Sequence, residues 1–438
     1  MAEGSKKKIV ITGVGSVSSV GIGTDEHYQA LLAGKSGIQR LPEWADEFTC
    51  KIGCLVKDFK AADWMDAKEA RRQGRYTHFA MAATKMALED SKMDTEKVNK
   101  DKFGVLVGSG IGGVEFFEDN CEKFNKAGGG GPGLKKVSPF LIPALISNTA
   151  SGVVAIELGA RGPNFGVVSA CATGTHAIGT AMDFMLRGEA DVMIAGGSEA
   201  AMTPLCFAGF CSMRAMVTTF NENPQAASRP FDVERAGFVM GEGAGVIVME
   251  TEEHALARGA DIYCEVAGYG ATCDAHHITA PAPDGNGLAR AIQSAMDMGD
   301  IKAEDMVGGY INAHGTSTPY NDKFETMAIK RVLGDEVAKQ AMYIPYTLQV
   351  YISSTKSVMG HTLGAAGGLE AVVCAQVLKH GEIPPTMNLE NPALDDGCNL
   401  NYCPGEKVVP ATKPKVAMSD NLGFGGHNAA LTFKAYEG

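Results

Sequence analysis

The sequence predicts an α/β protein made of two similar halves, residues 1–260 and 261–438. Apolar runs of strand length alternate with longer helical runs along the chain, which is typical of sheets covered by helices. The same order of elements begins again near Asp261, as expected of a duplicated βαβαβ unit. The 54 glycines suit tight turns and close packing of helices on strands.

The first half contains one complete set of these elements. β-branched and apolar runs predict strands at residues 8–13, 103–107, 164–168, 191–197 and 245–250. Helical patterns predict helices at residues 25–33, 76–91, 138–158, 172–186 and 252–258. The helix over 138–158 is apolar on most faces, so we expect it either deep in the core or in a subunit interface. Residues 203–241 are expected to form a loop region.

The second half repeats this order. Strands are expected at residues 262–268, 307–313, 351–354, 415–419 and 429–434, and helices at 285–298 and 363–379. The first two of these strands correspond to 8–13 and 103–107, and the strand and helix at 351–379 correspond to those around Cys171. Sequence identity between the halves is slight, so the duplication rests on pattern. Buried strands joined by helices predict mostly parallel sheets.

The composition indicates a soluble globular protein, with 45% hydrophobic and 21% charged residues. A formal net charge of −12 argues against general nucleic-acid binding. No apolar run is long enough to span a membrane, and the short polar start of the chain does not form a signal peptide. We therefore expect a soluble protein of a reducing compartment: the cytoplasm, or a plastid or mitochondrion if a transit peptide has been removed.

Metal and cofactor sites are not expected. The eleven cysteines are scattered without a CxxC pair, so they indicate neither a disulfide framework nor a zinc site. The glycine turn at residues 13–16 lacks the third glycine of a dinucleotide-binding loop.

The strongest site signal is Cys171, which stands in the turn Ser-Ala-Cys-Ala-Thr-Gly between a strand-like run and a helical run. Small neighbours allow a sharp turn and close approach of a substrate. A cysteine at a helix N-terminus feels the positive end of the helix dipole, which favours the nucleophilic thiolate. We therefore predict that Cys171 is a nucleophile with a lowered pKa.

Three further loops combine polar residues with glycine after a predicted strand. They span residues 312–322, 353–361 and 423–428, and the first two contain His314 and His361. Loops at the carboxyl ends of strands form the site in α/β sheets, so these loops and the Cys171 turn are expected to converge.

Together these loops closely resemble those of the elongating β-ketoacyl-acyl-carrier-protein synthases, the condensing enzymes of fatty acid synthesis. The resemblance extends from Ile9 to Phe433 and rests on specific motifs in order: the cysteine turn, His-Gly-Thr-Ser-Thr-Pro, Lys-Ser with Gly-His, and Gly-Phe-Gly-Gly. It implies a thiolase-like fold with a layered α-β-α-β-α core, a homodimer, and a Cys–His–His site.

The resemblance also implies roles for the site residues. Cys171 would accept the acyl chain, and His314 and His361 would donate hydrogen bonds to the enolate formed when malonyl-thioester loses CO2. Backbone N–H groups of Cys171 and Phe424 would bind the later oxyanion, with the Phe424 ring as a gate to the malonyl pocket. Lys356 and Glu325 are expected to form an ion pair that orients the histidines.

Substrate contacts follow from the same resemblance. Thr316 and Thr318 match positions that hydrogen-bond the phosphopantetheine arm, and Ile111 and Phe210 match positions that line the acyl pocket. The partner would be acyl carrier protein, which is acidic and needs a basic docking surface. The expected docking residues are Lys68, Arg71, Arg72, Lys135, Lys136 and Arg214, and we considered Arg75 with them.

The sequence departs from the family before the glycine turn, where Asp420-Asn421-Leu422 stands in place of the usual Asn-Ser-Phe. This departure, together with the bulky Cys206-Phe207, leaves the preferred chain length open.

Four other assignments were weighed. A polyketide ketosynthase remains the alternative because its motifs are nearly the same, although a free-standing chain favours fatty acid synthesis. A degradative thiolase uses a second cysteine near its C-terminus, which is missing from the glycine turn. The initiating condensing enzyme has an Asn where His361 stands, and a non-catalytic chain-length factor lacks the nucleophile.

Overall fold

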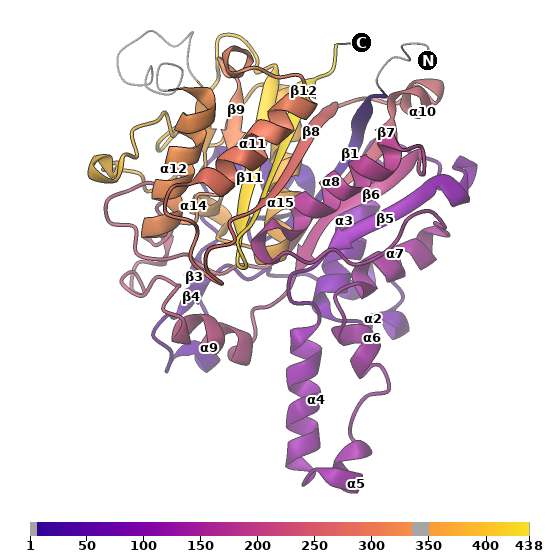
Figure 1. The fold of residues 1–438 in the computed structure, drawn as a ribbon. Coiled ribbons are helices and arrows are strands. Elements are labelled where there is room, and N and C mark those ends of the chain that lie inside the picture. Colours follow the sequence, from indigo (N-terminus) through magenta and orange to yellow (C-terminus); the bar gives the residue numbers. More distant parts are fainter. Residues whose placement is uncertain (1–6, 335–349, 438) are drawn as a thin grey trace.

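The computed structural model describes residues 7–334 and 350–437 of the chain. The prediction that residues 1–8 contain no signal peptide falls mostly on residues 1–6, which lie outside the described part. Apart from one separate two-stranded pair, the strands of the described residues form one long sheet (Figure 1). Its order is β10 (Tyr351–Ser353), β9 (Tyr310–Asn312), β11 (Val416–Gly423), β12 (His427–Ala435), β8 (Cys264–Cys273), β1 (Ile9–Ser18), β7 (Gly243–Thr251), β6 (Val192–Glu199) and β5 (Phe103–Gly108).

The sheet consists of two matching parts. They meet where β1 pairs with β8, with Ile9 opposite Val266. On one side the order is β1, β7, β6, β5, and Asn164 adds a bridge to the outer edge of β5. On the other side it is β8, β12, β11, β9, β10, which places the strands in the same relative order. The predicted duplication is thus confirmed, while the boundary near residue 260, between α10 (Glu252–Ala257) and β8, stays a prediction.

The prediction of mostly parallel sheets is wrong, because both halves are mixed. The pairs β5–β6, β9–β11 and β9–β10 are parallel, but β6–β7, β1–β7, β8–β12 and β11–β12 are antiparallel. The last pair is a hairpin closed by the Gly-Phe-Gly-Gly turn, and a strand that returns through so short a turn must run antiparallel. Since β9, β10 and β11 are parallel, their carboxyl ends still meet at one edge of the sheet.

Helices form three layers around the two parts of the sheet. The central helices α8 (Thr173–Leu186) and α15 (Ala366–His380) pack against strands of both halves. One outer layer contains α3 (Arg75–Ser91) and α7 (Thr149–Leu158), and the other contains α11 (Asn286–Met298) and α12 (Pro319–Leu333). This is the predicted α-β-α-β-α arrangement.

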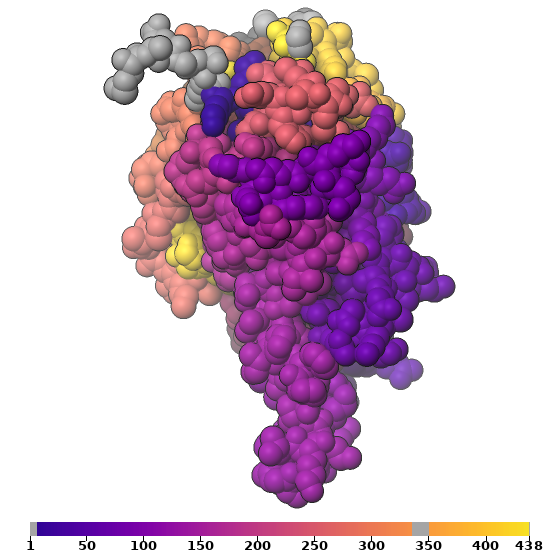
Figure 2. Space-filling model, turned by 90° about the vertical axis from the view of Figure 1, so that its right-hand side faces the viewer, coloured from indigo at the N-terminus to yellow at the C-terminus, as the bar shows by residue number. Residues whose placement is uncertain are grey.

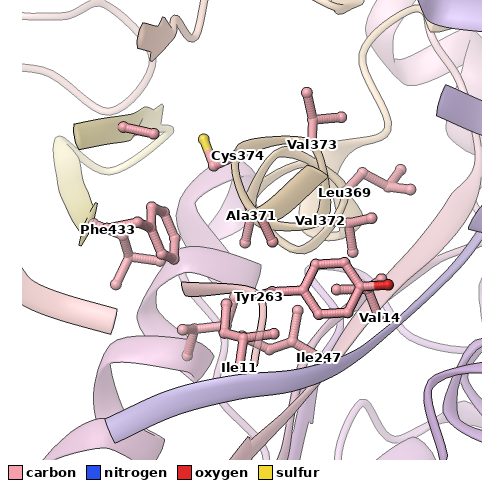
Figure 3. Close-up of a cluster of buried hydrophobic side chains, with 14 of the residues drawn as sticks. Ile11, Val14, Ile247, Tyr263, Leu369, Ala371, Val372, Val373, Cys374 and Phe433 are labelled. Carbon is pink, nitrogen blue, oxygen red and sulfur yellow. The ribbon is translucent and has the colours of Figure 1, made fainter. Parts of the chain in front are cut away.

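Helix α15 is the centre of the core. Figure 3 shows it end-on, with Val372 and Cys374 on its surface and with Ile11, Ile247 and Phe433 from strands of both halves around it. The residues of α15 from Ala366 to Leu378 are all buried, as expected of a helix that is surrounded by protein. Its first turn is also packed unusually closely against α8 and the sheet: a Cβ on Gly174 would lie 2.6 Å from the backbone nitrogen of Gly368.

Two predicted elements of the first half are wrong. The helix over 138–158 is broken into α6 (Leu141–Leu145) and α7, because Ile146 adopts an extended backbone and its carbonyl accepts a bond from the Tyr76 hydroxyl. The run 164–168 forms a single bridge rather than a strand. The loop region 203–241 contains a helix, α9 (Pro204–Ser212), whose N-terminus is capped by Thr203 and by the Glu118 carboxylate.

Residues 114–145 form a projecting arm made of α4 (Val114–Lys126), α5 (Gly130–Leu134) and α6. It extends from the body in Figures 1 and 2. Apolar side chains on the arm and on α7 are exposed, with Leu134 at 71%, Ile142 at 61% and Ile156 at 82%. The expectation that 138–158 lies deep in the core is therefore wrong for this face, and the expectation of a subunit interface stays a prediction.

The remaining named elements are short or peripheral. They are α1 (Thr24–Leu32), β2 (Gly21–Ile22), β3 (Gln39–Arg40), β4 (Ile52–Gly53), α2 (Ala67–Ala70) and α14 (Lys356–Met359). Within the described ranges, no helix has the length and apolar character needed to cross a bilayer.

Candidate active site

Cys171 lies in a single 3₁₀ turn, Ala170–Ala172, that leads directly into α8. The residue before it, Ala170, has a left-handed backbone with φ of 51°. Such a conformation is costly for a residue with a Cβ and marks a sharp, held turn. The backbone N–H of Ser169 donates to the Thr173 hydroxyl at 2.9 Å, which fixes the turn to the helix.

A cavity of about 630 Å³ opens onto this turn. Its lining includes Cys171, both candidate histidines and Phe424. The expected meeting of the cysteine turn with loops of the second half is therefore what the fold produces: one half supplies the sulfur and the other supplies both imidazoles.

The expected thiolate is not what the surroundings of Cys171 favour. Burial raises the pKa of this thiol to about 12, and the carboxylate of Glu199 acts in the same direction. The Lys356 ammonium and a hydrogen bond from the backbone N–H of Phe424 oppose the shift but do not cancel it. The prediction of a lowered pKa from the helix N-terminus alone is wrong for the free protein, because desolvation outweighs the dipole.

The two histidines follow β9 and β10, which are parallel neighbours. Their ring centroids are 5.2 Å apart and the rings are nearly perpendicular, at 87°. Burial, together with the positive charge of Lys356, holds the pKa of both His314 and His361 well below the usual range. Both rings are therefore neutral near pH 7 and can donate one hydrogen bond each without being charged.

Lys356 is ion-paired, but not with the predicted partner. Its ammonium contacts the carboxylate of Glu370 on α15, and both groups are buried. Glu325 instead accepts hydrogen bonds from the backbone N–H of Gly315 at 2.8 Å and from the Asn321 side chain at 3.1 Å. The predicted Lys356–Glu325 pair is thus wrong. Glu325 still supports the His314 loop, because its carboxylate accepts from the backbone N–H of Gly315 in that loop.

Asn421 connects this ion pair to a histidine. Its side-chain nitrogen lies 2.8 Å from Glu370 Oε2 and 3.0 Å from Nδ1 of His314, and its oxygen accepts from the Thr175 hydroxyl. Asn421 is fully buried on β11. The sequence showed it only as a departure from the family pattern, so its contacts were not predicted.

A second buried acid, Asp420, lies against Glu325. Burial and the charge of Asp420 raise the pKa of Glu325 well above its usual range. Burial also raises the pKa of Asp420 to about 7, with Glu370 adding to the shift and Lys356 opposing it. Two carboxyl groups this close do not both ionise at neutral pH.

Glu199 is a further supporting residue that sequence reasoning missed. Its carboxylate accepts from the backbone N–H groups of Gly110 at 2.8 Å, Ile111 at 3.2 Å and Gly364 at 3.1 Å. It thereby ties the loop after β5 to the turn before α15. An acidic residue at the end of a buried strand, β6, was the available signal.

The predicted substrate contacts also face the cavity. Ile111, Phe210, Thr316 and Thr318 line it, and the two threonine hydroxyls are 2.9 Å apart. Ile111 and Phe210 pack against the same apolar cluster as Cys171. Leu422, the departure next to the glycine turn, lines the cavity as well.

The predicted docking residues lie on three separate elements. Lys68 is on α2, with Arg71 and Arg72 directly after it, while Lys135 and Lys136 follow α5 on the arm. Arg214 is exposed on the rim of the cavity.

Two of the arginines already have partners. Arg72 lies 2.5 Å from Glu69 and over the Phe140 ring. Arg75 is bound to Glu242 at 2.9 Å, which removes it from the set considered.

The cavity brings a buried cysteine together with two neutral imidazoles in a duplicated α/β fold. This combination is typical of acyltransferases that act on thioesters. The chain belongs to the β-ketoacyl synthase family. Residues 6–255 match its N-terminal domain and residues 263–390 its C-terminal domain.

Similar proteins match all or nearly all of the chain. A 3-oxoacyl-[acyl-carrier-protein] synthase 2 of Synechocystis sp. is 47% identical over 438 residues, covering 100% of both chains. A protein of the same name from Staphylococcus aureus is 44% identical, covering 98% of this chain and 99% of its own.

Solved structures show the same architecture. A β-ketoacyl synthase of Burkholderia phymatum has a TM-score of 0.87 and 34% identity over 98% of this chain and 100% of its own. A ketosynthase from a complex with its type II PKS acyl-carrier protein, bound to the hexaketide, has a TM-score of 0.88 and 31% identity over 99% of this chain and 100% of its own.

Proposed function

We propose that this protein is a 3-oxoacyl-acyl-carrier-protein synthase that elongates fatty acids by two carbons through decarboxylative Claisen condensation. The single observation that carries the chemistry is the shared cavity of Cys171, His314 and His361. The full-length similarity to 3-oxoacyl-[acyl-carrier-protein] synthases 2 supports the fatty acid pathway.

The first step transfers the acyl chain to the protein. The sulfur of Cys171 attacks the acyl thioester, and the pantetheine thiol leaves with the proton that the cysteine gives up. A thiol whose pKa is about 12 must lose its proton during the attack rather than before it. The Phe424 N–H, already directed at the sulfur, is positioned to bind the oxyanion that forms beside it.

The second step makes the new carbon–carbon bond. Malonyl-thioester loses CO2, and the enolate oxygen accepts hydrogen bonds from the two neutral imidazoles. The enolate carbon then attacks the acyl carbon on Cys171. The cysteine leaves as a thiolate and takes up a proton, which restores the free enzyme.

Both substrates arrive on acyl carrier protein. We expect the carrier to dock on Lys68, Arg71 and Arg72 of α2 and its flank, with Lys135, Lys136 and Arg214 also in contact, and its arm to pass Thr316 and Thr318. One structural neighbour is a ketosynthase in complex with its acyl-carrier protein, which supports this proposal.

We further propose a homodimer. The apolar residues Ile142 on the arm, Ile156 on α7 and Phe165 beside the outer edge of β5 are exposed, and a second copy would cover them. Sedimentation equilibrium tests this directly. A monomer at micromolar concentration would contradict it.

A polyketide ketosynthase is the second candidate, because one structural neighbour is a ketosynthase in complex with its type II PKS acyl-carrier protein. The experiment that separates the two is purified enzyme with malonyl-carrier protein and acyl-carrier proteins of graded chain length, with products identified by mass. Saturated acyl chains extended by one two-carbon unit are expected. Preference for poly-β-keto chains would favour the alternative.

A further inference from the structure

Asn421 lies between a buried ion pair and a candidate catalytic imidazole. Its side-chain nitrogen is within hydrogen-bond distance of Glu370 Oε2, at 2.8 Å, and of His314 Nδ1, at 3.0 Å. Its side-chain oxygen faces the Thr175 hydroxyl. The amide is fully buried, so these contacts are not shared with bulk water.

The orientation of this amide is fixed by its neighbours. Glu370 is paired with the Lys356 ammonium, and an ionised carboxylate only accepts hydrogen bonds. The group that faces Glu370 must therefore be the amide NH2 and not the amide oxygen. The Thr175 hydroxyl supplies the matching donor on the oxygen side.

The second N–H of the amide then points at His314. A neutral imidazole has one nitrogen that donates and one that accepts, and Nδ1 must accept here because its partner is a donor. We infer that Asn421 is a positioning residue that holds neutral His314 in the tautomer with its proton on Nε2. In that tautomer Nε2 can only donate, which is what an enolate oxygen in the cavity requires.

His361 provides an internal contrast. Among the described residues, its Nδ1 is buried and has no hydrogen-bond partner. No neighbouring donor therefore restricts the tautomer of His361 as Asn421 restricts that of His314. The two imidazoles are equally buried but not equally constrained.

The role inferred for Asn421 depends on the departure from the family pattern at this position. The usual residue at this position is Ser, whose hydroxyl donates one hydrogen bond, whereas the Asn amide donates two. Only the amide can serve Glu370 and His314 at the same time. The inference rests on the proposed function for its catalytic meaning, but the tautomer itself can be measured without any substrate.

The first test is ¹⁵N NMR of the full-length protein with labelled histidines, with the His314 signals assigned by their loss in His314→Gln. The wild-type protein is expected to show His314 with a protonated Nε2 and an unprotonated Nδ1 at pH 7. A proton on Nδ1 of wild-type His314 overturns the inference, whether or not any variant folds and whether or not the protein condenses acyl chains.

The second test isolates the histidine chemistry from the nucleophile. In a Cys171→Ala background, Asn421→Leu removes the donor at nearly constant volume. Decarboxylation of malonyl-carrier protein is expected to slow about 100-fold, the usual effect of losing one oriented donor to a developing oxyanion. The His314 spectrum should change to a mixture of tautomers.

The matched control is Asn120→Leu in the same background. Asn120 is also buried and bonded on both sides of its amide, by the Phe116 carbonyl and the Ser138 N–H, but it lies on the arm. It should keep the decarboxylation rate within twofold. An Asn421→Leu protein that folds and keeps both its rate within twofold and the Nε2–H signal of His314 would refute the positioning role.

Discussion

The two halves of the chain contribute to the same cavity in different ways. The cysteine turn is held by backbone features: the left-handed Ala170 and a 3₁₀ turn, with the backbone N–H of Phe424 directed at the sulfur. The histidine loops are held by buried side chains, chiefly Lys356, Glu370 and Asn421. Backbone conformation therefore positions Cys171, whereas buried charged and polar side chains position the two imidazoles. Stability and activity should respond differently when substitutions or pH affect one side or the other.

The largest expected effect separates the reaction step assigned to the first half from the step assigned to the second. Cys171→Ala should abolish condensation, by more than about 1,000-fold, because Cys171 is the one thiol among the described residues that line the cavity. Decarboxylation of malonyl-carrier protein should continue, since the proposed mechanism assigns that step to the histidines. Product analysis and CO2 release check the two reactions separately. If both were lost together, the halves would not act independently.

Removing one member of the buried ion pair should be the next largest effect. Lys356→Met leaves the Glu370 carboxylate buried without its counter-ion, which typically costs about 3–5 kcal/mol. The free energy of unfolding in urea measures this loss. Lys356→Met with Glu370→Leu should recover part of it, because no charge remains buried. A single variant as stable as wild type would show that the histidine side does not depend on this charge pair.

The pH dependence of stability should also come from the histidine side. The pKa of Asp420 is about 7 in the fold, against about 4 in an unfolded chain. The stability that protonated Asp420 contributes is therefore complete below pH 4 and is lost as the pH rises to about 7. Burial and the Glu370 charge oppose the ionisation of Asp420, whereas the hydrogen bond with Glu325 and the Lys356 charge favour it.

Asp420→Asn cannot ionise and should not show this loss. Between pH 5 and pH 8, its free energy of unfolding should rise relative to wild type by roughly 2 kcal/mol. Cys171→Ala is the control, because a thiol with a pKa of about 12 does not titrate in this range. A difference between Asp420→Asn and wild type that is independent of pH would contradict the assignment.

The smallest expected effect concerns the proposed docking surface for acyl carrier protein. Arg72→Glu or Lys136→Glu should raise KM for acyl- and malonyl-carrier protein alike, by about tenfold at low salt, and the difference should shrink as salt screens the charges. Lys302→Glu, an equal charge change on an exposed residue of the second half, is the control. An effect on only one of the two substrates would indicate separate docking sites.

Sequence reasoning predicted most of the fold and the loops that meet at the cavity, because these are encoded in local patterns. The strand–turn–helix around Cys171 and the glycine-rich loops with His314 and His361 can be recognised within a few residues of chain. What it missed depends on distant contacts. The partner of Lys356 is fourteen residues away on α15, and nothing local favours Glu370 over Glu325.

The same limit explains the wrong pKa. A helix N-terminus is visible in the sequence, but the burial that raises the pKa of Cys171 comes from residues of both halves that are distant along the chain. Likewise, a run of apolar residues at 138–158 does not reveal that Ile146 breaks the helix or that Ile142 and Ile156 stay exposed.

The near contact of Gly174 with Gly368 has a consequence for protein engineering. Redesign of substrate range must leave this junction untouched, because even one added methyl group would push α15 away and carry Glu370 with it. The wall formed by α9 offers a safer place to change, since Phe210 borders the cavity from a helix that is remote from the junction.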